Sequence, residues 1–179
     1  AWTAVIARVH AGPPRATSRL AALLSAQQRE RQAPQEALDA SAAFSDPTTV
    51  AVVTGQQAGL FGGPLYTLHK AITAIKLARR ITAERGVRAV PVFWIDSEDH
   101  DWEEVRGCTV LDDEQHPHTV QLAALEGAGD RSIARLVLAG QGAAAVEALG
   151  TVLPPSEFTA PLLAMLGDEG LGPDRPVLV

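Results

Sequence analysis

The sequence predicts an α/β fold with a parallel sheet, and two apolar runs joined by a helix are the evidence for it. Residues 49–53 and 90–95 are rich in apolar and β-branched side chains, as is typical of strands buried on both faces of a sheet. Between these runs, apolar residues recur every three or four positions over 65–84, as on one face of a helix. A strand–helix–strand unit of this length is right-handed, and its two strands are parallel.

Composition and charge exclude several classes of protein. The chain has 179 residues, of which 46% are hydrophobic and 20% charged, as in globular domains. Its net charge of −6 has the wrong sign for binding phosphate backbones, so we predict no nucleic-acid partner. No apolar run approaches the roughly 18 residues that cross a bilayer, and one cysteine makes no internal disulfide. We therefore predict a cytoplasmic protein with no membrane partner.

The chain is predicted to contain three regions. Residues 1–46 have leucines at helical spacing and a break at Pro34, which indicates a supporting helical segment. Residues 47–115 contain both apolar strands and are predicted to form the first half of the core. Residues 116–179 form the third region. Because the chain begins with Ala1 rather than Met, we expect a piece of a longer protein.

Further elements are predicted after the second apolar run. A third strand is expected over 105–111. Two segments, 119–122 and 133–138, are predicted to pair as a small β-hairpin. Helices are then predicted to end near residues 149 and 166.

A glycine-rich segment follows the first strand and precedes the long helix. Glycines let backbone N–H groups approach a ligand, and the helix N-terminus favours a phosphate or carboxylate. The alternative is that the glycines only permit a tight turn. The spacing matches neither the dinucleotide fingerprint nor the Walker loop. The candidate binding residues here are Gly55, Gln56, Gln57, Gly59, Gly62, Gly63 and Pro64, with Pro64 in the first turn of the helix.

The first two turns of the long helix carry Tyr66, His69 and Lys70. Offsets of three and four residues place these side chains on one side of a helix. Lys70 or His69 is predicted to contact a phosphate or carboxylate, and the alternative is a solvated helix face.

The second strand is followed by an acidic cluster that contains Glu98, Asp99, His100 and Asp101. A carboxylate beside an imidazole suits general acid–base chemistry near neutral pH. Such residues also ligate Mg²⁺ or Zn²⁺, but adjacent positions rarely converge on one ion, so we predict no metal site. A merely polar loop is the alternative. Cys108 is predicted to be a small apolar residue in a strand, and His116 and His118 are predicted to lie in a surface turn.

These two motifs resemble the bacillithiol biosynthesis cysteine-adding enzymes. The resemblance rests on VVTGQQAGLFGGPLYTLHKA at 52–71, on VPVFWI at 90–95 and on EDHD at 98–101, and it is strong over 48–112. It implies a Rossmann-like core related to nucleotidyltransferase folds, with 116–179 as the start of an insertion or connecting region. It also implies a homodimer formed through a coiled coil in the full-length protein.

The resemblance further implies a ligase that adds L-cysteine to the amino group of glucosaminyl malate. Asp99, His100 and Asp101 would be its catalytic residues, opposite a substrate pocket formed by the glycine-rich segment and lined by Tyr66, His69 and Lys70. An adenylate route to the amide would require ATP, and no other cofactor is implied.

Two features favour one of two alternative functions, the non-catalytic domain. Arg106 and Gly107 stand where the family has an Asn-His pair. The chain is also short for the family. One alternative is a nucleotidyltransferase-like enzyme acting on another amine or sugar. The other is a non-catalytic ligand-binding or assembly domain.

Overall fold

The computed structural model describes residues 2–13, 15–138 and 140–169. The chain divides into two compact units, the first comprising Ala1–Thr54 and His69–Trp94 and the second Gly55–Leu68 and Ile95–Val179. The division falls within three elements, which are β1 (Val50–Gln57), α4 (Tyr66–Arg85) and β2 (Ala89–Asp96).

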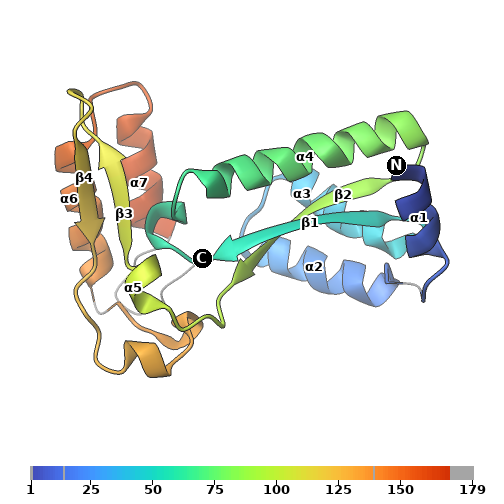
Figure 1. Cartoon of the computed structure of the whole chain (residues 1–179), viewed down its shortest axis with the longest axis horizontal. Coiled ribbons are helices and arrows are strands. Elements are labelled where there is room, and N and C mark those ends of the chain that lie inside the picture. The colour runs from blue at the N-terminus through green and yellow to red at the C-terminus, as the bar shows by residue number, and fades with distance from the viewer. Residues whose placement is uncertain (1, 14, 139, 170–179) are drawn as a thin grey trace. The chain divides into compact units, whose positions relative to one another are not determined.

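The first unit contains a parallel pair of strands between helices (Figure 1). Val50 of β1 packs in a cluster with α1 (Trp2–His10) and α4. Val90 of β2 packs in a second cluster with α2 (Ser18–Glu30) and α3 (Gln35–Ala42). The predicted α/β class and the helical character of the N-terminal segment are therefore confirmed.

The predicted strand–helix–strand unit is also confirmed, with one difference at the end of the first strand. α4 ends just before Gly86, whose φ of +63° is the left-handed conformation that commonly follows a helix. β1, however, continues through Gln57, so the prediction that it ends at Gly55 is wrong. Gly55 does not have a positive φ, and a glycine in extended conformation can remain in a strand.

The expectation that both strands are buried on both faces is wrong. Val53 is 63% exposed and Trp94 is 66% exposed. Successive side chains point to opposite faces of a strand, so Val50 and Val52 enter the cluster with α1 and α4, whereas Ala51 and Val53 point away from it. The helices α2 and α3 pack instead on β2.

The second unit contains an antiparallel hairpin of β3 (Gly107–Leu111) and β4 (Pro117–Gln121). Thr109 lies opposite Thr119, and their hydroxyl oxygens are 2.9 Å apart. The third predicted strand is therefore present, but the predicted pairing of 119–122 with 133–138 is wrong. The first part of the later segment is a 3-10 turn, η4 (Ile133–Arg135). Its apolar pattern reflects burial in a shared core and not strand pairing.

That core holds the second unit together. Ile133 and Leu138 are almost completely buried, and they belong to one cluster with Trp102, Val120 and Leu149. The two predicted later helices are present as α6 (Gln141–Val152) and α7 (Thr159–Glu169). Residues 170–179, the end of the third predicted region, lie outside the described residues. Among the residues that the structure describes, every helix is too short or too polar to cross a bilayer.

Candidate functional site

The glycine-rich segment and the acidic segment meet through buried apolar contacts within the second unit. Ala58 and Leu60 follow β1, and Trp102 and Val105 belong to the short helix α5 (Trp102–Val105). All four side chains are buried in one cluster. This packing brings the end of β1 close to α5, and we call residues 97–101, which precede α5, the acidic loop.

A chain of side-chain hydrogen bonds lies over this packing. The Gln57 amide nitrogen donates to Glu104 Oε2 at 3.2 Å. The Gln56 amide nitrogen donates to Gln57 Oε1, and it lies 3.3 Å from the hydroxyl oxygen of Tyr66. The end of β1 is thus joined to the start of α4 on one side and to α5 on the other.

Asp99 organises the backbone of the acidic loop. Its Oδ1 accepts the N–H of His100 at 2.6 Å and the N–H of Asp101 at 3.2 Å. The pKa of Asp99 is lowered chiefly by the hydrogen bond from the Asp101 backbone, with further contributions from the His100 backbone and the Gln57 side chain, while partial burial opposes the shift. The Asp99 carboxylate is therefore ionised and in contact with Gln57.

Asp101 also has a backbone partner. It is the N-cap residue of α5, and its Oδ1 accepts the N–H of Glu104 at 3.1 Å. Of the three residues predicted to be catalytic, Asp99 and Asp101 thus hold the loop and the helix in place. His100 is exposed between them, and its backbone carbonyl accepts the N–H of Trp102 at 2.9 Å. The side chains of His100 and Asp101 are both exposed, and the catalytic role of the three residues stays a prediction.

The glycines after β1 are explained by the turn that they form. A Cβ on Gly59 would lie 3.0 Å from the Cα of Gly63, and Gly62 and Gly63 have φ angles of +87° and +74°. Pro64 lies two residues before α4 rather than in its first turn, and its carbonyl accepts the N–H of Thr67 at 2.8 Å. These observations favour the tight-turn interpretation. Their role as a substrate pocket stays a prediction.

The three predicted residues of α4 belong to different compact units. Tyr66 belongs to the second unit with Gln56, whereas His69 and Lys70 belong to the first unit. His69 is exposed, and its carbonyl accepts the hydroxyl of Thr73 at 2.7 Å. The convergence of all three side chains on one ligand remains a prediction.

Glu104 is the residue that the sequence interpretation missed. A signal for it exists in the spacing Asp101-x-x-Glu104, which is typical of a helix start. Arg106, which stands at a family Asn position, is structural here: its Nη2 lies 2.8 Å from Glu103 Oε2, and its Nη1 donates to the Leu122 carbonyl at 2.8 Å.

Several other candidates show no sign of chemistry. Burial raises the pKa of the Cys108 thiol, which disfavours the thiolate, as expected of an apolar strand residue. His116 lies in the exposed turn of the hairpin, as predicted, whereas His118 is an exposed residue of β4, so the prediction of a turn position is wrong for it. Within the described part of the chain, no three His, Cys, Asp or Glu side chains converge to hold a metal ion.

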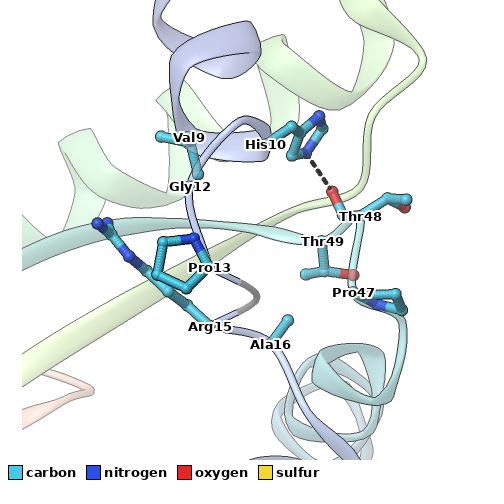
Figure 2. Close-up of a pocket in the computed structure, with 9 residues that line it drawn as sticks. All are labelled: Val9, His10, Gly12, Pro13, Arg15, Ala16, Pro47, Thr48 and Thr49. Atoms are coloured by element: carbon cyan, nitrogen blue, oxygen red, sulfur yellow. Dashed lines mark hydrogen bonds between the residues drawn. The ribbon is translucent and has the colours of Figure 1, made fainter.

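A separate pocket of about 350 Å³ lies in the first unit, between the end of α1 and the start of β1 (Figure 2). His10 closes one side of it by a 2.9 Å hydrogen bond between its Nε2 and the Thr48 carbonyl oxygen. The lining also includes Pro13, Arg15 and Thr49. The Thr49 hydroxyl donates to the Ala43 carbonyl at 2.7 Å, so this side chain has a structural hydrogen-bond partner.

The match to a known protein family covers nearly the whole chain. The family model described as bacillithiol biosynthesis BshC, N-terminal Rossmann-like domain, matches residues 1–170. A protein of Salinibacter ruber named "Putative cysteine ligase BshC" is 44% identical over 115 residues, which are 63% of this chain and 20% of that protein. Proteins of the same name from Symbiobacterium thermophilum and Heliobacterium modesticaldum are 34% identical over 153 residues and 51% identical over 79 residues. Those matches cover 86% and 44% of this chain, and 27% and 14% of the relatives. The chain thus spans about a quarter or less of each of these relatives.

Proposed function

Because the chain belongs to the bacillithiol biosynthesis BshC family, with a Rossmann-like fold, we propose that its protein adds L-cysteine to the amino group of glucosaminyl malate. The new bond is an amide between the cysteine carboxyl carbon and the amine nitrogen. The printed names of the relatives support a cysteine ligase. The substrates and the type of bond are our proposal.

The contact between Gln57 and α5 is the observation that supports this function best. Two segments separated by 47 residues in sequence are joined by a hydrogen bond between polar side chains, Gln57 and Glu104. Asp99 also contacts Gln57, and the exposed His100 is the next residue of the acidic loop. Polar groups that converge on one place from distant segments are characteristic of a ligand site.

We assign the chemistry of this site by the charges it contains. The acidic loop carries Glu98, Asp99 and Asp101, which favour an ammonium or amine group over an anion. His100 is the proposed general base, since an imidazole can take the proton that an amine must lose to attack a carboxyl carbon. Asp99 and Asp101 hold His100 in position through the loop backbone.

The attacked carboxyl group must carry a leaving group. An acyl-adenylate would provide AMP as that leaving group. Its formation would consume ATP as a third substrate and release pyrophosphate. The turn after β1 lacks the lysine of a Walker loop, because Pro64 follows Gly63. We therefore propose ATP as the activating substrate without assigning its phosphates to this turn.

Turnover by the full-length gene product tests the proposal. L-cysteine, glucosaminyl malate and ATP are incubated with the protein, and bacillithiol is measured by mass spectrometry together with released pyrophosphate. We expect the thiol product in an amount that depends on all three substrates. Nucleotide-dependent pyrophosphate release with another amine or sugar, and none with glucosaminyl malate, would instead identify a different nucleotidyltransferase-like enzyme. Tight binding of glucosaminyl malate without product would identify a non-catalytic binding domain.

A further inference from the structure

The start of α5 has the sequence of a capping box but only half of its hydrogen bonds. In that motif the N-cap side chain accepts the backbone N–H three residues on, and the carboxylate at that later position reaches back to the N-cap N–H. Asp101 makes the first bond, to the N–H of Glu104 at 3.1 Å. The second bond is absent from the described contacts of Glu104, because the Asp101 N–H donates to Asp99 Oδ1 at 3.2 Å.

Because Asp99 accepts the Asp101 N–H, the Glu104 side chain does not make the hydrogen bond that it would make in a complete capping box. The Glu104 carboxylate instead accepts the hydrogen bond from the Gln57 amide. Trp102 and Val105, which flank Glu103 and Glu104 on α5, are buried in the same cluster as Ala58. The helix that carries Glu104 is thus fixed against the segment that follows Gln57.

The Glu104 carboxylate determines which end of the Gln57 side-chain amide faces it. An amide side chain has one end that donates and one that accepts, and the two ends are nearly equal in shape. An ionised carboxylate only accepts, so the end of Gln57 that faces Glu104 and Asp99 must be the NH₂ group. The Gln57 oxygen then accepts from Gln56. The two carboxylates thereby orient two successive amides.

We propose that Glu104 is a positioning residue of the ligand site, which orients the Gln57 amide for binding of the amine substrate. This inference rests on the proposed function for the identity of that substrate. Glu104 acts through Gln57 and does not itself take part in the chemistry. A glutamine at position 104 would present either end of its own amide, so the orientation of Gln57 would depend on Asp99 alone and be held less firmly.

The test compares Glu104→Gln with its neighbour Glu103→Gln in the full-length gene product. We expect Glu104→Gln to raise KM for glucosaminyl malate about tenfold and to change kcat less than about threefold, as for a lost binding interaction. Glu103→Gln removes only the ion pair with Arg106 on an exposed side chain, so KM should stay within about twofold. A purely structural role of Glu104 would lower kcat through a smaller active fraction and leave KM unchanged.

A double variant separates action through Gln57 from direct action. Residues that act as a unit have non-additive effects. Gln57→Ala should raise KM by itself, and adding Glu104→Gln to it should produce no further increase. An additional tenfold increase in the double variant would show that Glu104 works independently of Gln57, which overturns the proposal.

A measurement without turnover keeps the inference separate from the proposed function. In protein labelled with ¹⁵N-glutamine, the side-chain NH₂ resonances of Gln57 should shift in Glu104→Gln and stay in place in Glu103→Gln. If the wild-type protein makes no bacillithiol but this shift occurs, the proposed reaction fails while the orienting contact stands. If bacillithiol is made and Glu104→Gln changes neither the resonances nor KM, the reaction stands and the inference fails.

Discussion

The acidic loop and the hairpin turn at residues 112–116 contain the same residue types but differ in what these residues hold together. Each contains an aspartate that accepts two backbone N–H groups and has a histidine nearby. In the hairpin turn, Asp112 Oδ1 accepts from Glu114 at 2.9 Å and from His116 at 2.8 Å, and its Oδ2 lies 2.7 Å from His118 Nε2. The pKa of Asp112 is lowered chiefly by the His116 backbone hydrogen bond, just as the pKa of Asp99 is lowered chiefly by that of Asp101.

The difference between the two regions lies in the reach of their contacts. The described partners of Asp112 are at most six residues away, and together they close a turn between β3 and β4. The acidic loop and α5 instead hold Gln57 of β1, and the bond to Glu104 spans 47 positions. Clustered aspartate and histidine residues therefore do not identify a site. The contact with a distant strand distinguishes the acidic loop.

Replacing each of the two histidines in turn with alanine should give the largest difference in activity between the two regions. In the full-length gene product, His100→Ala should lower kcat/KM for bacillithiol formation about 100-fold or more, the range expected for loss of a general base. His118→Ala should leave kcat/KM within about twofold, because His118 only bonds Asp112 across the turn. Equal losses in both variants would remove the distinction between the two regions.

The turn that leads from β1 to α4 should be sensitive to a single methyl group. Gly59→Ala places a Cβ 3.0 Å from the Gly63 Cα, and the resulting strain should cost about 1–3 kcal/mol of unfolding free energy. Gly107→Ala is the matched control, since its Cβ would meet Gln121 and Thr119 at 3.6 and 3.7 Å, which are ordinary contacts. Its unfolding free energy should change by about 0.5 kcal/mol or less. Urea titration measures both, and a neutral Gly59→Ala would contradict the close approach.

Acid should weaken both regions, with a consequence for activity in only one. A folded-state pKa below the ordinary value means that the stabilisation is present above that ordinary value, 3.8 for both aspartates, and is lost as the pH falls through the folded-state pKa. The Tm should therefore fall as the pH drops below about 4, toward the folded-state pKa values of the two aspartates. In Asp112→Asn this fall should be smaller, because the group no longer titrates.

The corresponding acidic-loop variant sharpens the comparison. Asp99→Asn should also reduce the acid dependence of Tm, and in addition it should raise KM for glucosaminyl malate, because Asp99 contacts Gln57. Asp112→Asn should leave KM unchanged near neutral pH. A KM effect in Asp112→Asn would show that the hairpin turn contributes to the site.

Patterns with a strong local cause could be predicted from the sequence. The helical period over 65–84 and the glycine at 86 predicted α4, and the two apolar runs predicted β1 and β2. Pairing could not be predicted in the same way. The alternation over 119–122 is compatible with any antiparallel partner, and the structure pairs β4 with β3 because a turn of five residues joins them.

The candidate site was predictable in part for a similar reason. The resemblance implied that the acidic residues lie opposite a pocket that includes Gln57, and Gln57 contacts both the acidic loop and α5. The role of Glu104 could not be predicted, because a capping box normally turns that carboxylate back on its own helix. Only the position of Asp99, which takes the Asp101 N–H, directs it elsewhere.

The distribution of the three tryptophans gives the second unit an optical signal of its own. Trp102 is 4% exposed in the core of the second unit, whereas Trp2 and Trp94 of the first unit are 41% and 66% exposed. An indole shielded from water emits at shorter wavelength than one in contact with it. Loosening of the second unit should therefore red-shift the fluorescence even while the first unit stays folded, so a spectrometer can follow this unit of the polypeptide without any added label.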